Sequence, residues 1–186
     1  MLRPLLVSFA SLTVITGLAY PLAFTGVAQV LFPRQAQGSL LVSHGQVKGS
    51  LLVAQATEDP RYFWSRPSAT GGFPTNPGAS GGSYQAPSNP ALAEAVAKRA
   101  EALRAADPGN TAPIPQDLLT ASASGLDPHV SLEGALWQVP RVAKARNQDP
   151  GALEALVRRH AEGGTLVPPY VNVRALNGSL DGLDGR

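Results

Sequence analysis

The fold is decided first by residues 5–31, which read LLVSFASLTVITGLAYPLAFTGVAQVL. Eighteen of these 27 residues are apolar, and the 30 residues between Arg3 and Arg34 contain no Asp, Glu, Lys, Arg or His. A helix needs about 20 predominantly apolar residues to cross the hydrocarbon core of a bilayer. Because lipid offers the backbone no hydrogen-bond partners, a run that inserts there is helical. The stretch therefore predicts one transmembrane helix over residues 5–31, kinked at Pro21.

A cleaved secretory signal is the alternative interpretation of the same stretch, since it also begins with a short basic segment and an apolar run. The run here is longer than the usual apolar region of a signal, and no small-x-small cleavage site follows it, so an uncleaved anchor is favoured. Arg3 and the terminal amine stand against Arg34 and Lys48, so the positive-inside rule hardly discriminates between orientations. A short leader, residues 1–4, is expected to stay in the cytoplasm. The chain would then be a single-pass protein of the inner or plasma membrane, with residues 32–186 on the extracytoplasmic side.

Composition excludes several classes of protein. Lys and Arg number 15 and Asp and Glu 13, a net charge of +2, which is too balanced for a nucleic-acid binder held by bulk electrostatics. The chain has no Cys. A disulfide scaffold, a Cys-ligated zinc or iron–sulfur site and a Cys nucleophile are therefore all excluded.

Residues 32–186 are expected to form one mixed α+β domain. The string Gly-Ser-Leu-Leu-Val occurs at residues 38–42 and again at 49–53 with turn residues between, which predicts a β-hairpin. Residues 67–93 are uncharged and rich in Gly, Pro and Ser, as in a long structured loop. Further expected features are helices opened by Asn89, Ser131 and Asp149, a kink or break at Pro140, a strand over residues 170–173, and a frayed tail over 178–186.

The densest aromatic group in the chain is Tyr62, Phe63 and Trp64, followed by Arg66. Trp, Tyr and Arg dominate the binding energy of protein interfaces, so the group is a candidate anchor for a partner. The alternative is that the rings close the core beneath the following loop. We expect some of the rings to lie in the core and others at the surface.

Residues 80–83 read Ser-Gly-Gly-Ser, with Gln85 two positions later. Backbone N–H groups in such a loop can bind an anion. The Gly-Lys-Ser/Thr ending of a Walker A loop is missing. A turn-rich loop shaped by glycine is the favoured interpretation.

Ser124, Asp127 and His129 supply the residue types of a hydrolase triad. Neighbours in sequence rarely converge as a triad requires, and no Gly-x-Ser-x-Gly elbow is present. A structural role is favoured, in which Asp127 and Ser131 accept hydrogen bonds from backbone donors at the start of a helix. The histidines, His44, His129 and His160, have no metal-site spacing, and His160 is expected to be a hydrogen-bonded residue at the edge of the core.

Several strings then agree, in order, with one family. They are residues 63–69 (FWSRPSA), 80–83 (SGGS), 87–92 (PSNPAL), 121–129 (ASASGLDPH) and 138–143 (QVPRVA). Together with the single N-terminal span, this set resembles the C subunit of the bacterial Kdp potassium-transporting ATPase over nearly the whole chain. Residues 165–170 and 84–86 depart from the pattern of that family.

The resemblance implies a non-catalytic accessory subunit of a high-affinity, ATP-driven potassium uptake complex. Its partners would be a channel-like potassium-binding subunit, a P-type ATPase subunit and a small single-span subunit. In that family the subunit is needed for assembly and is described as a catalytic chaperone that raises the ATP affinity of the ATPase subunit.

By the same resemblance, the proposed nucleotide contact falls on Ser80, Gly81, Gly82 and Gln85. No tightly bound cofactor is implied, ATP would act through the ATPase subunit, and potassium is the transported ion. An extracytoplasmic loop does not meet cytoplasmic ATP, so a simpler expectation is that the Gly-rich loop and the aromatic group lie over the outer mouth of the channel-like subunit.

Two further hypotheses remain open at this point. One is a membrane-tethered hydrolase that uses Ser124, Asp127 and His129. The other is a secreted binding protein that has lost residues 1–30.

Overall fold

The structure is a computed structural model that describes residues 2–43 and 45–182. The chain divides into two compact units, Met1–Leu40 and Leu41–Arg186. His44 and the last four residues of the tail lie outside the described residues.

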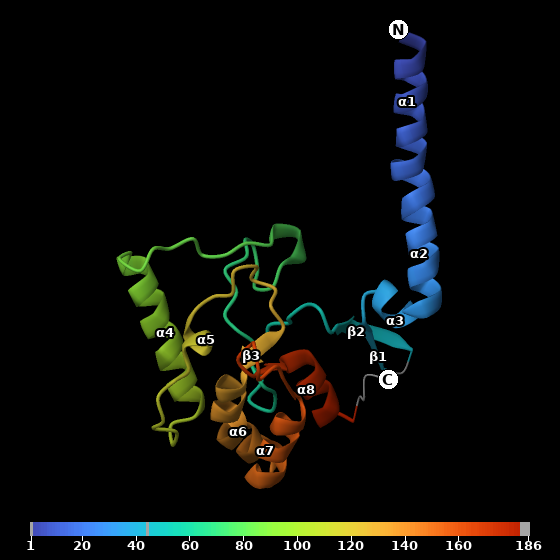
Figure 1. The fold of residues 1–186 in the computed structure, drawn as a ribbon. Helices are drawn as coiled ribbons and strands as arrows, with labels where there is room; N and C mark the ends of the chain where they lie inside the picture. Colours follow the sequence, from blue (N-terminus) through green and yellow to red (C-terminus); the bar gives the residue numbers. More distant parts are fainter. Residues whose placement is uncertain (1, 44, 183–186) are drawn as a thin grey trace. The chain divides into compact units, whose positions relative to one another are not determined.

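The first unit is helical along almost its whole length. Helix α1 (Leu2–Val14), a π-helical turn η1 (Ile15–Ala19) and helix α2 (Tyr20–Leu31) follow one another without a break, and the short helix α3 (Pro33–Ala36) comes next (Figure 1). None of the residues in these elements is buried. The apolar helix of Leu2–Leu31 is long enough to cross a membrane, as residues 5–31 predicted.

The π-helical turn lies directly before Pro21. Proline has no N–H to donate to the carbonyl group four residues earlier, and its ring clashes with that carbonyl group. Tyr20 N donates to Ile15 O, which is five residues back, and this wider turn accommodates the proline. The helix therefore continues through Pro21 rather than ending there.

The second unit contains two small sheets. Strands β1 (Leu40–Ser43) and β2 (Gln46–Ser50) form a two-stranded sheet, and β3 (His129–Ser131), β4 (Ala161–Glu162) and β5 (Tyr170–Asn172) form an antiparallel sheet in the order β3-β5-β4. Val171 is the centre of the second sheet, since it is paired with Val130 and with Ala161. With the helices, the sheets make this unit a mixed α/β domain, which confirms the predicted fold class.

The hairpin is confirmed, but its predicted second strand is wrong by three residues. Gly45, with a φ of +74°, lies in the tight turn after β1, so the pairing strand already begins at Gln46. The Ser50 hydroxyl accepts a hydrogen bond from Leu52 N at 3.0 Å, and the chain turns there. The second Gly-Ser-Leu-Leu-Val string is therefore mostly outside the sheet.

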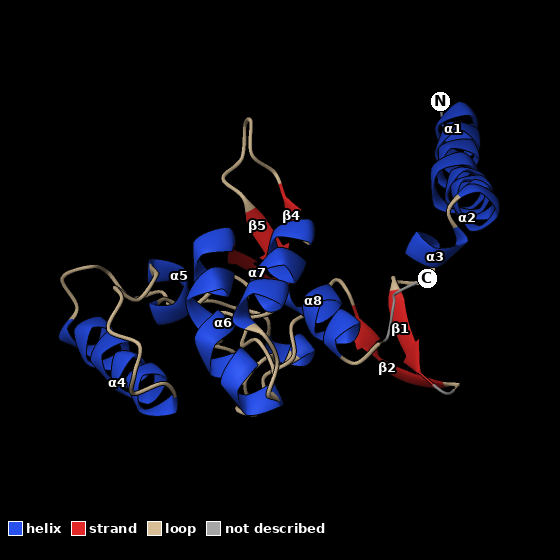
Figure 2. Ribbon diagram, turned by 90° about the horizontal axis from the view of Figure 1, so that it is seen from below, coloured by secondary structure: helices blue, strands red, loops and turns tan. Residues whose placement is uncertain are grey.

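Helices surround the second sheet. Helix α6 (Leu132–Arg146) lies beside α7 (Pro150–Arg159), and α8 (Val173–Leu180) follows β5 directly, an arrangement seen in Figure 1 and Figure 2. Helix α4 (Pro90–Ala106) packs with the short α5 (Gln116–Leu119), and a 3-10 turn η2 (Pro77–Ala79) interrupts the long loop. The fully buried side chains of the core are Phe63, Leu153, Leu176, Gln138, Val130, Val142, Val157, Val171 and Val173.

The predicted helix starts are confirmed by their capping bonds. Asn89 Oδ1 accepts from Ala91 N at 3.0 Å, Ser131 Oγ from Gly134 N at 2.8 Å, and Asp149 Oδ2 from Ala152 N at 2.8 Å. The N–H groups of the first turn have no carbonyl acceptor within the helix, and these side-chain oxygens accept from them instead. Pro140 does not divide α6, which is one helix from Leu132 to Arg146.

The sequence analysis did not predict helix α8, whose last residues, 178–180, overlap the tail expected to be frayed. The strand ends at Asn172, whose side chain accepts from Ala175 N at 3.0 Å and caps α8. Helix α8 then continues through the region expected to be frayed, as far as Leu180, with Leu176 fully buried. The packing of this helix against the core outweighs its weak local signal.

Candidate functional site

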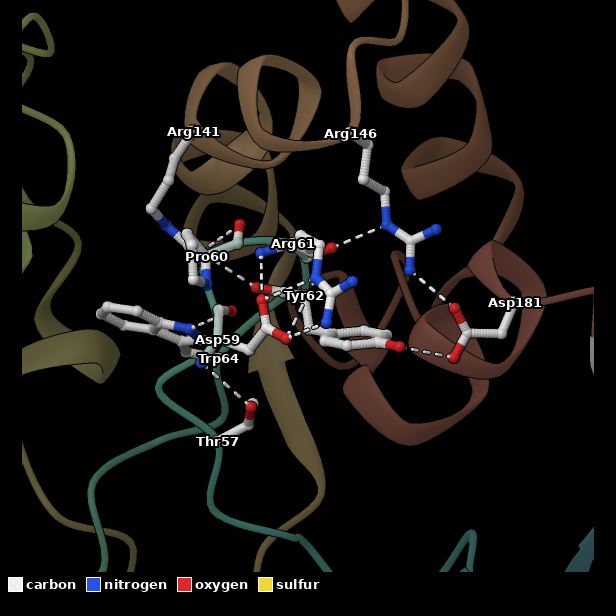
Figure 3. Close-up of polar contacts among 9 residues, drawn as sticks. All are labelled: Thr57, Asp59, Pro60, Arg61, Tyr62, Trp64, Arg141, Arg146 and Asp181. Atoms are coloured by element: carbon white, nitrogen blue, oxygen red, sulfur yellow. Dashed lines mark hydrogen bonds and ion pairs between the residues drawn. The ribbon is translucent and has the colours of Figure 1, made fainter.

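The predicted aromatic group lies in a segment whose backbone is hydrogen-bonded by two amide side chains. Figure 3 shows Tyr62 and Trp64 of this segment together with Arg141, which also contacts it. Asn177 of α8 accepts from Phe63 N and donates to Phe63 O, both at 2.9 Å. Gln138 of α6 accepts from Trp64 N at 2.7 Å and donates to Trp64 O at 3.1 Å. Each amide therefore pairs with one residue as a neighbouring β-strand would.

Arg141 fixes the same segment from α6. Its guanidinium group donates to Pro60 O at 2.8 Å, Tyr62 O at 3.1 Å and Gln138 Oε1 at 2.8 Å. It also lies 4.1 Å from the centre of the Trp64 ring, which is a cation–π geometry. Arg141 is only 3% exposed, and this burial lowers its pKa to about 10. The group is still cationic at neutral pH.

Tyr62 is fixed at the outer edge of the segment. Its hydroxyl group donates to Asp181 Oδ2 at 2.9 Å, and Arg146 donates to the other oxygen of that carboxylate at 2.7 Å. Arg146 also lies over the Tyr62 ring, 4.9 Å from its centre, and donates to Arg61 O at 2.8 Å. The bond to Asp181 raises the pKa of Tyr62, because a negative neighbour disfavours the phenolate.

The structure separates the members of the aromatic group. Phe63 is fully buried in the core, whereas Tyr62 and Trp64 are half-buried. Arg66 is half-buried too. It lies 3.6 Å from Asp127 and donates to Ala121 O at 3.5 Å. Rings thus lie on both sides, as expected, and the surface available to a partner comes from Tyr62, Trp64 and Arg66.

The pKa of Asp59 is expected to lie well below that of an ordinary Asp. The side chain and then the backbone N–H of Arg61 donate to its carboxylate, which lowers its pKa from 3.8 to about 2. Since the pKa is lower in the folded state, the stabilisation is complete above pH 4 and is lost as the pH falls toward 2. Carbonyl NMR of the full chain in micelles measures this pKa directly. Arg61→Gln should raise this pKa toward 3.8 but not fully to it, because the backbone N–H of residue 61 still donates to the carboxylate. An ordinary pKa in the unsubstituted chain would contradict the assignment.

Three loop segments meet at what we call the loop junction, formed by residues 67–70, 80–82 and 122–125. Gly81 N and the Ser80 hydroxyl both donate to Ser124 O, at 2.9 and 3.0 Å, and Ser122 N donates to Pro67 O at 3.1 Å. A Cβ on Gly82 would lie 3.0 Å from Ala123 O. The glycines of the Ser-Gly-Gly-Ser string therefore allow backbone to pack against backbone.

The nucleotide contact was predicted at Ser80, Gly81, Gly82 and Gln85, and the first three of these residues form part of the loop junction. The Gly81 N–H, which would have to face an anion, donates instead to Ser124 O. Ser80 is exposed, and Gln85 is half-buried.

Two aromatic side chains on the long loop escaped the sequence analysis. Tyr84 is 90% exposed and has a φ of +51°, and Phe73 is 58% exposed. Both lie on a loop that the junction fixes in place. Side chains of Asn76 and Thr70 add further bonds there, including Asn76 Nδ2 to Gly71 O at 2.9 Å and Thr70 Oγ1 to Phe73 O at 2.7 Å. No signal in the sequence separates exposed from buried rings in such a loop.

Ser124, Asp127 and His129 do not form a triad in the described part of the chain. Asp127 Oδ1 lies 3.1 Å from His129 Nδ1, but the Ser124 hydroxyl accepts from Leu126 N at 3.1 Å. Asp127 also accepts from His129 N at 3.0 Å, and Ser131 caps α6. Ser131 therefore caps the helix as predicted, whereas Asp127 accepts from the first residue of β3 and not from the start of the helix.

The described residues contain no group of three or more His, Asp or Glu side chains that could hold a metal ion. His160 lies 3.0 Å from Leu156 O and 2.9 Å from the Ser179 hydroxyl, which confirms its expected place at the edge of the core. His44 lies outside the described residues.

Comparisons with known proteins agree over nearly the whole chain. Residues 2–182 match the family model described as KdpC, K+-transporting ATPase, c chain. The chain is 57% identical to the potassium-transporting ATPase KdpC subunit of Methylibium petroleiphilum, with 98% of this chain and 97% of the relative covered. It is 53% identical to the corresponding protein of Dechloromonas aromatica, with the same coverage, and 56% identical to that of Variovorax paradoxus, with 97% and 95% covered. The chain belongs to the KdpC family, the c chain of the K+-transporting ATPase.

Proposed function

We propose that this chain is a non-catalytic, single-span subunit that promotes assembly of a potassium-transporting ATPase complex. Its partners are a channel-like potassium-binding subunit, a P-type ATPase subunit and a small single-span subunit. Membership of the family and the names of the relatives support the place in the complex. The exposed aromatic side chains on a fixed loop are the observation that carries the docking role.

The anchor is the helix of Leu2–Leu31. It is 30 residues long, an 18-residue stretch within it has a mean hydropathy of 1.8, and none of its residues is buried. At 1.5 Å per residue it is about 45 Å long, which exceeds the hydrocarbon thickness of about 30 Å. In this proposal the N-terminus is cytoplasmic and the second unit is extracytoplasmic.

The docking surface consists of Tyr84 and Phe73. Large exposed aromatic side chains are costly in water and are typical anchors of protein interfaces. The loop junction keeps both in a fixed loop, so little conformational entropy is lost on binding. Tyr62, Trp64 and Arg66 are a second candidate contact. We propose that the chain raises the ATP affinity of the ATPase subunit indirectly, by promoting assembly, because the Gly81 N–H already donates to an internal acceptor.

Replacing both Tyr84 and Phe73 by Ser is expected to weaken co-purification of the complex roughly 30-fold, because loss of an interface anchor costs about 2 kcal/mol. The measurement is a pull-down of the tagged full chain from its native membrane, with the partner subunits quantified by mass spectrometry. Leu52→Ser is the matched control, since Leu52 is 62% exposed but lies outside the long loop. The control should retain its partners.

Three outcomes would contradict the proposal. Equal co-purification of the double variant and the Leu52 control would show that Tyr84 and Phe73 do not form a docking surface. A native chain that lacks residues 1–30 and has no partner would favour the secreted binding protein. Nucleotide-dependent chemical shifts at Gly81 and Gly82 in the isolated full chain would show that ATP binds directly.

A further inference from the structure

A cavity of about 400 Å³ lies within the second unit, away from the loop junction. Strand β2, residues 55–57 and helix α8 contribute to its wall. This volume is in the range of small-molecule sites in proteins. The side chains that define its charge are Lys48, Arg174 and Asp181.

Arg174 is the unusual member of this wall. Its Nη2 donates to Lys48 O at 3.1 Å, but its Nε is buried and has no hydrogen-bond partner among the described residues. No carboxylate of the described chain forms an ion pair with it. Desolvation lowers its pKa, which reflects a positive charge that has lost water without gaining a counter-ion.

The backbone leaves room for this guanidinium group. Gly49 has a φ of +143°, and a Cβ there would lie 2.7 Å from Arg174 Nη2 and 2.8 Å from Gln55 Nε2. Gln55 Nε2 in turn donates to Lys48 O at 3.0 Å. A side chain at position 49 would therefore force the ends of the Arg174 and Gln55 side chains to shift.

The balance of charge in the cavity is positive. Asp181 is the one carboxylate among the described residues of the wall, and it already accepts from Arg146 at 2.7 Å and from Tyr62 at 2.9 Å. Lys48 is exposed, and its ammonium group donates to the neutral Gln46 side chain at 3.2 Å. Within residues 2–43 and 45–182, neither cation therefore has a negative partner.

We propose that this cavity binds a phosphate group, supplied either by the headgroup of an anionic phospholipid or by a soluble phosphate ester. Arg and Lys are the side chains that bind phosphate oxygens in proteins. A phosphate would supply the counter-charge that Arg174 and Lys48 lack. Leu41, which also lines the cavity, follows the last residue of α2 by ten positions, and this short tether favours a lipid as the source.

The test uses the full chain in nanodiscs of neutral phosphatidylcholine. In one arm glycerol phosphate is added, and in the other phosphatidylglycerol is included in the disc. The Arg174 guanidinium signals in the ¹⁵N NMR spectrum are expected to shift and saturate in at least one arm. Saturation by glycerol phosphate identifies a soluble ester as a sufficient ligand, and saturation by phosphatidylglycerol alone identifies the lipid.

Three variants test the residues. Lys48→Gln is expected to weaken binding about tenfold, the loss of one charge-assisted hydrogen bond. Arg174→Gln should do the same, and because it removes the guanidinium signals its binding is followed through the backbone amide signals of α8. Gly49→Ala should weaken it too, while leaving both charges in place. Arg158→Gln is the control, because Arg158 is exposed and pairs with Glu154 outside the cavity. Saturation in neither arm, or unchanged affinity in Lys48→Gln and Gly49→Ala, would overturn the proposal, whether or not Arg174→Gln folds. Assembly of the complex is measured separately and is independent of this result.

Discussion

Arg141→Met is expected to lower the free energy of unfolding by about 3 kcal/mol, because each buried acceptor that loses its donor costs about 1–3 kcal/mol. Met fills a similar volume but donates no hydrogen bond. Pro60 O and Tyr62 O would lose the donor that Arg141 now provides. The Trp64 ring would also lose its cation. For a chain of this size the melting temperature should fall by roughly 10 °C.

Thermal unfolding of the full chain in micelles, followed by near-UV circular dichroism, measures this effect through the aromatic signals. Lys144→Met is the matched control, since Lys144 is exposed on the same helix, and it should melt like the unsubstituted chain. Arg141→Lys keeps the charge but not the planar fork that reaches three acceptors, so it should also be destabilised. Equal melting temperatures for Arg141→Met and Lys144→Met would show that the segment holds its place without Arg141.

Much of the helical structure is predictable because its signals are local. Asn89, Ser131 and Asp149 each act within three residues of themselves, by accepting a hydrogen bond from the first turn of a helix. The apolar run before Arg34 is equally local, since its length and lack of charge decide its structure without reference to any other segment. The capping bonds confirm the first set, and the helix of Leu2–Leu31 confirms the second.

Helix α8 was missed because its stability is not local. It is eight residues long and contains Asn177 and Gly178, and an isolated helix of that length is marginal in water. Its burial of Val173 and Leu176 and the bonds of Asn177 to Phe63 make it stable. Phe63 is 114 residues away in the sequence, so no window of sequence contains the reason for the helix.

The candidate site was predictable in its residue types but not in its geometry. The aromatic group and the Gly-rich string are visible in the sequence. Gln138 and Asn177, which hold the aromatic segment, are ordinary polar residues until the fold brings them to it. The partner of the Gly-rich string was likewise hidden, because Ser124 lies 44 residues from Ser80. The three segments of the loop junction meet only in the folded chain.

Gly125→Ala is expected to open the loop junction and lower the free energy of unfolding by about 3 kcal/mol. Gly125 has a φ of +68°, a conformation that costs a residue with a Cβ about 1–2 kcal/mol. The added Cβ would also lie 2.5 Å from Thr70 Cγ2 and 3.0 Å from Gly81 O. Because Thr70 and Gly81 belong to the other two segments of the junction, we expect the strain to separate the segments rather than to stay at position 125.

Three measurements follow this change. The melting temperature should fall by roughly 10 °C, limited proteolysis should cut within residues 67–93, and co-purification of the complex should weaken, since Tyr84 and Phe73 lose their fixed positions. Gly109→Ala is the control, because a Cβ there meets nothing within 4 Å and its φ is ordinary. Unchanged proteolysis of the Gly125 variant would show that the long loop is held by other contacts.

A double substitution separates the two causes. Thr70→Ser removes Cγ2 but keeps the hydroxyl group that donates to Phe73 O and accepts from Asn76 N. In the Gly125→Ala chain it should therefore relieve the overlap with Thr70, while the close approach to Gly81 O and the cost of the positive φ remain. Partial recovery of the melting temperature, together with recovery of co-purification, would mean that the position of the loop determines assembly. Recovery of stability without recovery of co-purification would instead separate the loop junction from docking and contradict the proposed surface.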